Sequence, residues 1–558
     1  MTFGQFQRAA ARLLVVSGAL VAPTLSAQDQ RPAPPTSAAQ PAPAGDAIRL
    51  TVEDAVRRAI DHNPDLAVVK LGTDVEAERV GEADAAYRPV FSTVFGRSAI
   101  TVPSSSPLTG EAGFETSDLF ASTGIRQRLR WGSGTYSVSW DAARTSTNSL
   151  FSTFEPSLQS GLQMAFSQPL LRDRKMDSAR LQTVTSQRNL KSADLRVRES
   201  TVQTTAAVKQ AYWTLKAAMA NVTVQQRSLE LAEDLVRQNR ARVNVGQAPP
   251  LDLVQAEAEV ATRRENLIRA GATAGDAEDR LRRLIMDPAD AAFWGVRLEP
   301  IDEPAGAVAP PNVNQAIGSA LRERYDLAVA RNELENARTN ISFFENQKLP
   351  DVRLEASYRS GGAGGTQLVR TGEFPGTITG RLQSGFGDVL GQMFSYDYPT
   401  WSVGVRLNYP IGRSFEEAGH ARAEIEHRQS AHRIASLESR IAETVRQAAR
   451  QVQSTAERVD ASRAGQTLAE QRLSVEQRRF EAGLSTTFLV TQAQRDLLQA
   501  QVNVLQAMLD HQSSLITFDA VQLAPAATDT TAIGPSGTPV SPLPTLAPQG
   551  IFRAGGGL

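Results

Sequence analysis

The chain has 558 residues, of which 59 are basic and 60 acidic, so its formal net charge at pH 7 is −1. This balance gives no reason to expect a nucleic-acid partner. The chain contains no cysteine, which excludes disulfides, a lipid-modified N-terminal cysteine and cysteine-ligated metals. Its length is sufficient for several ordinary domains.

The N-terminus is typical of an export signal. Arg8 and Arg12 precede an apolar run over 13–21, and small residues end at Ala27, where we expect cleavage. The run is too short for a spanning helix, so a signal peptide over 1–27 is predicted, with a retained N-terminal anchor as the alternative. A flexible Pro/Ala-rich lead-in follows over 28–47.

The first half is predicted to run from a helix through strands to two long helices. A helix over 51–86 is broken locally at Asn63-Pro64, and alternating apolar and polar residues indicate strands within 89–169. A helix over 177–245 would be about 100 Å long. Another helix begins at Pro249-Pro250 and reaches residue 285. Residues 286–311 form a connector rich in Pro, Gly and Ala.

The second half is predicted to repeat this plan. A helix spans 312–347, and strands lie within 350–410, with Val352–Tyr358 and Trp401–Tyr409 as the clearest alternations. The glycine-rich stretch 361–399 is expected to be the loop between them. Long helices follow over 415–480 and up to residue 520. The tail over 521–558 is predicted to be disordered.

The two halves share sequence. Residues 52–60 correspond to 313–321, and the Arg-x-x-x-Gly of Arg242 and Gly246 corresponds to Arg479 and Gly483. The chain therefore divides into a first repeat over 48–285 and a second repeat over 312–520. A duplicated half of this kind indicates a tube rather than a catalytic pocket.

The strands and helices both require partners. Two clear strands in each half give four per chain, which cannot close a barrel, and an open edge cannot lie in lipid. Long helices with one apolar stripe also need neighbours. We therefore predict a homo-oligomer, part barrel and part helical tube. The alternative is an exported coiled-coil scaffold that does not span the membrane. An additional hairpin near 124–142 either decorates a loop or enlarges the barrel, and the sequence leaves both open.

The duplicated start at Leu50-Thr51-Val52-Glu53-Asp54-Ala55, the step Asn63-Pro64-Asp65-Leu66 and the two Arg-x-x-x-Gly turns resemble TolC-type outer-membrane efflux proteins. The resemblance implies an α+β membrane protein of the Gram-negative outer membrane. It would be a homotrimer with a twelve-strand barrel in outer-membrane lipid, shared among the three protomers, and a coiled-coil periplasmic tunnel. Its function would be a passive channel of a tripartite efflux or type I secretion system, with a periplasmic adaptor (membrane fusion) protein and an inner-membrane transporter as partners.

Glycine at the two Arg-x-x-x-Gly turns permits the positive φ of a tight helix reversal, and arginine suits a helix C-terminus. The resemblance further implies that these tips dock the adaptor. The predicted docking residues are Arg242, Gly246, Gln247, Ala248, Arg479, Gly483, Leu484 and Ser485.

The resemblance places the tunnel entrance six and nine residues after each tip glycine. These positions hold Asp252 and Gln255 in the first repeat and Leu489 and Gln492 in the second. The second repeat thus lacks acidic residues there, which predicts a neutral constriction. Asp252 is interpreted either as part of a gate or as the cap of the helix that begins near Pro250.

Other chemistry finds little support in the sequence. Glu417-x-x-His420 and Glu424-x-x-His427 have the spacing of helical di-iron ligands, but they follow each other on one helix instead of facing across two. We predict no catalytic residue, no cofactor and no metal. Trp401 and Tyr409, at the two ends of the clearest strand, are predicted to lie at the membrane interfaces.

Overall fold

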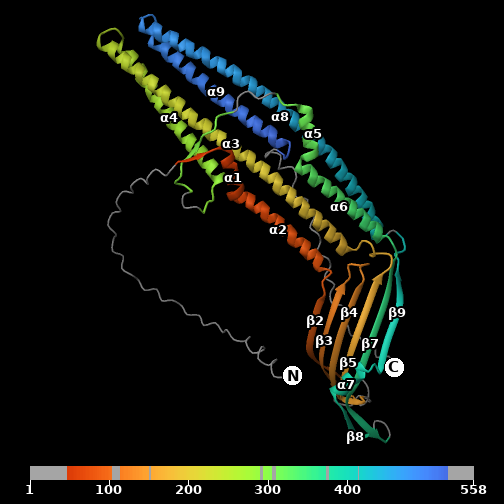
Figure 1. Cartoon of the computed structure of the whole chain (residues 1–558). Helices are drawn as coiled ribbons and strands as arrows, with labels where there is room; N and C mark the ends of the chain where they lie inside the picture. Colours follow the sequence, from red (N-terminus) through yellow and green to blue (C-terminus); the bar gives the residue numbers. More distant parts are fainter. Residues whose placement is uncertain are drawn as a thin grey trace, which may run out of the picture. The chain divides into compact units, whose positions relative to one another are not determined.

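The computed structural model describes residues 47–103, 113–149, 152–289, 293–304, 310–372, 376–412 and 414–525. The predicted signal peptide, and nearly all of the predicted lead-in and tail, lie outside these residues. The described chain passes twice through one plan: two shorter helices, antiparallel strands, then two long helices (Figure 1).

Four helices belong to the first half: α1 (Val52–His62), α2 (Pro64–Ala85), α3 (Ser178–Asn244) and α4 (Pro250–Ile285). The side chains of Thr51, Asn63 and Asp177 start three of them by accepting a hydrogen bond from a first-turn N–H. Proline occupies the first position of α2 and α4, where its missing N–H costs nothing. The helices predicted from the sequence pattern, including the break at Asn63, are present.

The second half contains α5 (Val313–Glu323), α6 (Tyr325–Gln347), α8 (Phe415–Glu481) and α9 (Thr487–Val521). The repeat extends to the caps, because Asn312 starts α5 at the position that corresponds to Thr51. Within the described residues, no helix combines the length and hydropathy needed to cross a membrane.

Two hydrophobic cores reflect the duplication. In the first, Ala55 and Ala59 of α1 are fully buried against α3 and α4. In the second, the corresponding Ala316 and Ala320 of α5 pack against α8 and Val521 of α9. Alanine at these positions lets the short helix lie close to the long ones. Each half therefore fixes its short helix pair onto its own long hairpin.

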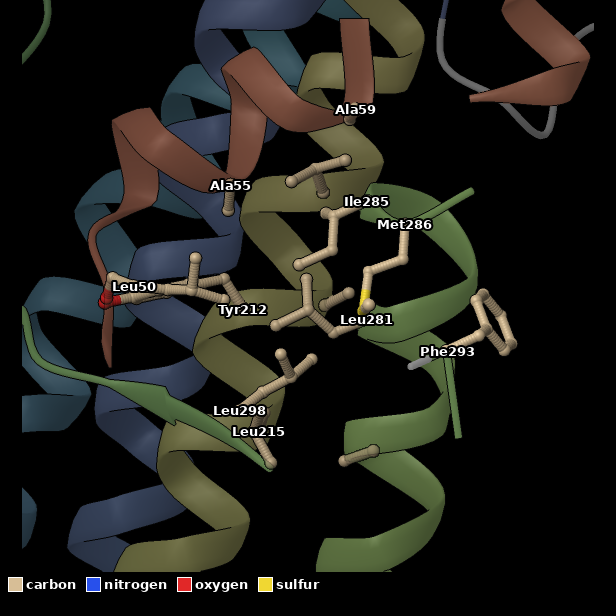
Figure 2. Close-up of a cluster of buried hydrophobic side chains, with 13 residues drawn as sticks. Leu50, Ala55, Ala59, Tyr212, Leu215, Leu281, Ile285, Met286, Phe293 and Leu298 are labelled. Carbon is tan, nitrogen blue, oxygen red and sulfur yellow. The ribbon is translucent and has the colours of Figure 1, made fainter. Parts of the chain in front are cut away.

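Tyr212 of α3 organises the first core (Figure 2). Its hydroxyl lies 2.9 Å from the Leu50 carbonyl oxygen and 3.0 Å from a carboxylate oxygen of Asp302, and it accepts the Asp302 N–H. Burial raises the pKa of Tyr212 to about 12. Two short parallel strands, β1 (Ile48–Leu50) and β6 (Leu298–Pro300), lie beside α3. The hydrogen bonds of Tyr212 hold them there through Leu50 in β1 and through Asp302, which follows β6. β6 lies within the segment predicted as a connector.

One antiparallel sheet contains six long strands. Their order is β2 (Val90–Val102), β3 (Phe114–Arg128), β4 (Thr135–Thr147), β5 (Phe154–Pro169), β7 (Asp351–Thr371) and β9 (Tyr398–Asn408), and β8 (Thr377–Ser384) pairs with the far end of β7. The prediction of two strands in each half is therefore wrong, because the first half supplies four. The hairpin near 124–142 is β3 and β4. β2 is hard to distinguish in the sequence because apolar residues occupy both of its faces, for example Phe91 and Val94.

The stretch 361–399, predicted to be a loop, is ordered instead. β7 continues into it, and helix α7 (Phe386–Phe394) packs on β5 and β7 with Val389 and Met393 buried. A Cβ at Gly362 would lie 2.1 Å from the Val389 carbonyl oxygen, so glycine permits this contact. Ser360 Oγ donates to the Met393 carbonyl oxygen at 2.6 Å. Glycine here marks a close approach, and the loop prediction is wrong.

Candidate functional site: paired helical tips and a two-faced sheet

The two tips, at α3–α4 and α8–α9, have the same backbone structure. Gly246 and Gly483 have φ of +75° and +78°. The N–H of Gln247 bonds to the Arg242 carbonyl oxygen at 2.8 Å, and the N–H of Leu484 bonds to that of Arg479 at 2.7 Å. These are Schellman turns with glycine in the left-handed conformation. A Cβ placed on either glycine would meet no neighbouring atom within 4 Å. The positive φ alone therefore explains why glycine is required at these two positions.

The two tip arginines differ in their contacts. Arg242 lies over the Phe480 ring, with its guanidinium carbon 4.0 Å from the ring centroid, and donates to the Phe480 carbonyl oxygen at 2.7 Å. This cation–π contact ties α3 to α8. Arg479 is exposed and pairs with Glu476 of its own helix at 3.4 Å. The structure thus joins the two hairpins through Arg242 and leaves Arg479 at the surface.

The other predicted docking residues lie at the same end of the helices. Gln247 and Leu484 are exposed, while Ala248 and Ser485 are half-buried. Ser485 donates to Glu476 at 2.7 Å, and this hydrogen bond lowers the pKa of the Glu476 carboxyl with help from Arg479.

Beyond Leu484, which was predicted to dock, sequence reasoning missed the exposed apolar residues around the tips. Leu484 is 77% and Phe488 64% exposed, and Val245, Leu251 and Val254 are also exposed. Isolated apolar residues beside a glycine turn were the available signal. We call Val245, Leu251, Leu484 and Phe488 the apolar tip residues. Exposed apolar side chains grouped in this way are typical of a protein contact.

The four predicted entrance residues follow the tips. Asp252 lies in the first turn of α4, but the helix starts at Pro249 without a side-chain cap. The Asp252 carboxylate instead lies 3.3 Å from the hydroxyl of Thr487 on α9, which is also 3.1 Å from Asn239 Oδ1 of α3. Asp252 therefore contacts the second hairpin. It does not cap α4, because the N-cap of that helix is Pro249.

Gln255 and Leu489 are exposed, on α4 and α9 respectively. Gln492 donates to Asp496 one turn further along α9, at 2.8 Å.

A buried carboxylate forms a second link between the hairpins. Glu259 of α4 is ion-paired with Arg263 of its own helix and with Arg495 of α9. Burial opposes ionisation of Glu259, but the hydrogen bond from Arg495 and the charge of Arg263 outweigh it, so the pKa of Glu259 is lowered. In this conformation the two hairpins are therefore bonded at Arg242, Thr487 and Glu259.

The sheet has two unlike faces. One face carries mainly apolar side chains: Phe91, Phe95, Ile125, Val138, Trp140, Met164, Phe166, Leu354, Tyr358, Val403, Val405 and Leu407. We call this the apolar face. The opposite, polar face carries most of the serines and charges of the strands. Its ion pairs include Arg359 with Asp141 at 2.7 Å and Arg406 with Glu355 at 2.9 Å.

The two predicted interface aromatics lie on and beside β9. Trp401 is 71% exposed on the apolar face, opposite Tyr358 of β7, and Tyr409 is exposed just after the strand. They are separated by the apolar residues Val403, Val405 and Leu407. Their role at the membrane interfaces remains a prediction.

The sequence matches the family model described as outer membrane efflux protein over residues 55–285 and 316–521. The two blocks cover more than half of the chain and coincide with its two rounds of helices and strands. The chain belongs to the outer membrane efflux protein family, which confirms its resemblance to TolC-type proteins.

Individual relatives are distant. The chain is 26% identical over 289 residues to the outer membrane efflux protein BepC of Brucella suis biovar 1 (strain 1330), a match covering 51% of this chain and 56% of that protein. It therefore matches about half the length of this curated relative. The CmeC outer membrane channel of Campylobacter jejuni has a similar fold, with a TM-score of 0.60 at 13% identity, covering 84% of this chain and 85% of that chain. The outer membrane protein VceC of Vibrio cholerae has a TM-score of 0.58 at 16% identity, covering 85% and 96%.

These comparisons establish the fold and the location. The chain is an outer membrane efflux protein by its family, and its fold is that of solved outer-membrane channels. The alternative of an exported scaffold outside the membrane is excluded by this membership.

Proposed function

We propose that three copies of the chain form a passive conduit through the outer membrane and dock, by their helical tips, to a periplasmic adaptor and an inner-membrane transporter. The observation that carries this proposal is the two-faced sheet. An apolar face suits contact with lipid, and a polar face with ion pairs suits a water-filled interior. The transporter drives export, so the conduit needs no chemistry of its own.

The sheet of one chain is incomplete as a membrane element. Within the described residues, the outer edges of β2 and β9 have no strand partner. Unpaired N–H and C=O groups are unfavourable in lipid, where water cannot satisfy them. Pairing of β9 with β2 of a neighbouring copy removes both edges. A closed ring of chains follows from this requirement, and three is the number that the family resemblance implies.

The tips support the docking part of the proposal. The apolar tip residues are exposed beside the two Schellman turns, as are Gln247 and Arg479, and the turns lie at the end of the long helices furthest from the sheet (Figure 1). An apolar group with a polar rim fits a protein partner that presents a complementary helical tip. Efflux is favoured over polypeptide secretion, because the family model and BepC are both described as efflux proteins.

The conduit is tested with the full chain. The outer-membrane fraction is extracted in mild detergent, the particle mass is measured by light scattering, and the protein is reconstituted into planar bilayers. A mass of three chains with stepwise conductance is expected. A particle of one chain, or a trimer that conducts no ions under any applied voltage, overturns the proposal.

Docking is tested separately at the tips. Leu484→Asp and Phe488→Asp are compared with Leu468→Asp, a matched change at a similarly exposed leucine within α8. In vivo cross-linking to the adaptor is expected to be lost in the tip variants and kept in the control, while trimer mass and bilayer conductance stay unchanged in all three. Equal cross-linking in tip and control variants contradicts docking at this surface.

A further inference from the structure

The hairpin of β3 and β4 is part of the main sheet. It lies between β2 and β5, with thirteen paired positions on the β2 side and eleven on the β5 side. All six long strands have at least the eleven residues of β9, enough to cross the hydrocarbon region when tilted. The family resemblance implies four strands from each chain. The described chain offers six, and this difference carries the inference, which rests on the proposed function.

Part of the apolar face continues across the hairpin. One row of cross-strand neighbours runs through all six strands: Phe91, Ile125, Val138, Met164, Tyr358 and Trp401. Each member is apolar or aromatic. A loop decoration in water has no need of this alternation, whereas a strand in lipid does. The hairpin therefore has the pattern of a membrane strand pair.

The polar face ties the hairpin to the second half of the chain. Arg359 of β7 reaches over β5 and pairs with Asp141 of β4, with 2.7 Å between Nη2 and Oδ2. Gly161 of β5 leaves the space for this crossing, since a Cβ there would lie 2.7 Å from Arg359 Nη2. β4 is thus held in the sheet by its backbone pairing on both sides and by this ion pair.

The turn of the hairpin is fastened to the helices that flank it. Arg130 pairs with Asp84 of α2 at 3.1 Å, and Arg128 pairs with Asp177, the cap of α3, at 3.5 Å. Arg180 of α3 donates to the Arg130 carbonyl oxygen at 2.6 Å. The end of the hairpin therefore lies at the junction of strands and helices, between the helices that precede β2 and follow β5.

The strand count is compatible with closure. Six antiparallel strands bring β2 and β9 to the two edges in opposite directions, so β9 of one copy meets β2 of the next in an antiparallel pair. Bacterial outer-membrane barrels have an even number of antiparallel strands, which three such sheets satisfy.

From these contacts we infer that the trimer closes an eighteen-strand barrel, six strands from each chain, in place of the twelve that the resemblance implies. Barrel diameter grows roughly linearly with strand number, so this barrel is about one and a half times as wide as one of twelve strands. A barrel of this size leaves an aqueous channel. The helical tunnel, and not the barrel, then limits the cross-section of the solutes that pass.

A shortened variant provides the matched control. Residues 103–152 are replaced by Asn-Gly, which forms a two-residue hairpin turn and joins β2 directly to β5. The existing registers bring Phe91 opposite Met164 in this variant, so the apolar row is kept. Cryo-electron microscopy of both trimers is expected to show eighteen strands for the full chain and twelve for the variant.

The absence of cysteine gives a second measurement that does not depend on folding of the shortened variant. In the full chain, Ser137→Cys with Ala165→Cys joins β4 to β5 and is expected to form an intramolecular disulfide in most molecules. Ser92→Cys with Gln163→Cys reports the competing arrangement, in which the hairpin leaves the barrel and β2 pairs with β5. This second pair is expected to stay reduced.

The outcomes separate the two proposals. A full-length trimer with twelve strands in the barrel, or oxidation of the Ser92→Cys and Gln163→Cys pair, overturns the eighteen-strand barrel and leaves the conduit intact. A particle that is not a trimer in the outer membrane overturns the proposed function itself.

Discussion

Arg359 of β7 and Asp141 of β4 form an ion pair, although the two residues are 218 positions apart in sequence and their strands are separated by one intervening strand in the sheet. The crossing depends on Gly161 of β5, which places no side chain beneath the guanidinium group. The pair links the two halves of the chain on the polar face. If that face lines the conduit, its charges act directly on permeating ions.

Asp141→Asn is expected to shift ion selectivity toward anions, because it leaves the Arg359 charge unpaired on the polar face. Both side chains are partly exposed, so the loss of stability should stay below about 1 kcal/mol. The reversal potential in bilayers under a KCl gradient measures the shift. The double variant Asp141→Asn with Arg359→Gln restores neutrality and should return the potential toward that of the wild type. An unchanged potential in the single variant would place the pair away from the ion path.

The tip glycines are expected to resist substitution for a backbone reason. Gly246→Ala or Gly483→Ala should each destabilise the trimer by about 1–2 kcal/mol, because alanine is unfavourable at positive φ. Gly465→Ala is the matched control, since this residue lies within α8 and a Cβ added to it would likewise meet no other atom within 4 Å. It should stabilise by about 0.5–1 kcal/mol. Thermal unfolding in detergent measures both the loss of stability at the tips and the gain at Gly465. A stabilising effect of alanine at either tip would contradict the requirement for glycine at positive φ.

The repeat offers a matched pair of arginines. Arg242→Ala should weaken the link between the hairpins, because it removes the Phe480 stacking and one interhelical hydrogen bond. Arg479→Ala removes only an exposed pair with Glu476. We expect higher bilayer conductance from Arg242→Ala than from the wild type, and little change from Arg479→Ala. The same conductance for both variants would show that the Arg242 contact does not restrict opening.

Stability is expected to fall in mild acid through His511 of α9. Its Nδ1 lies 3.2 Å from Thr455 Oγ1, its Nε2 is buried without a partner among the described residues, and burial lowers the pKa of His511 despite the nearby Asp460. The unfolded chain therefore binds a proton at a higher pH than the folded chain does. The contribution of His511 to stability is therefore fully present above the ordinary histidine pKa of about 6.5, and it decreases as the pH falls below that value.

The melting temperature at pH 7.5 and pH 5.5, for wild type and for His511→Gln, measures this contribution. The glutamine variant should be less stable at pH 7.5 but should lose less on acidification. An equal loss in both proteins would assign the acid sensitivity to other groups.

The helices are predictable because their signals are local. Caps such as Thr51 and Asn63, proline at Pro250 and glycine at Gly483 define where helices begin and end, and the apolar period defines their buried faces. The duplication adds a second, independent copy of each signal. The family can be recognised on this basis from the sequence alone.

The sheet is less predictable because strand pairing is not local. β2 has apolar residues on both faces, and the sequence pattern of β3 and β4 indicates a hairpin without giving its place in the sheet. The glycine-rich sequence around Gly362 is typical of a loop. In the structure, the lack of a side chain at Gly362 instead allows α7 to pack closely on β7. At the tips, the glycines can be located from sequence, but the stacking of Arg242 on Phe480 joins residues 238 apart and depends on how the hairpins pack.

The pairing of β1 with β6 has a consequence for biogenesis. β6 comes at the end of the first half, and Tyr212 of α3 bonds to Leu50 of β1 and to Asp302, two residues after β6. Every residue of this helical core lies before residue 303, so the core can form while the second half is still being synthesised or exported. Because domains generally fold as units with the N-terminal part first, the first half can bury its own apolar surface before β5 pairs with β7 of the second half.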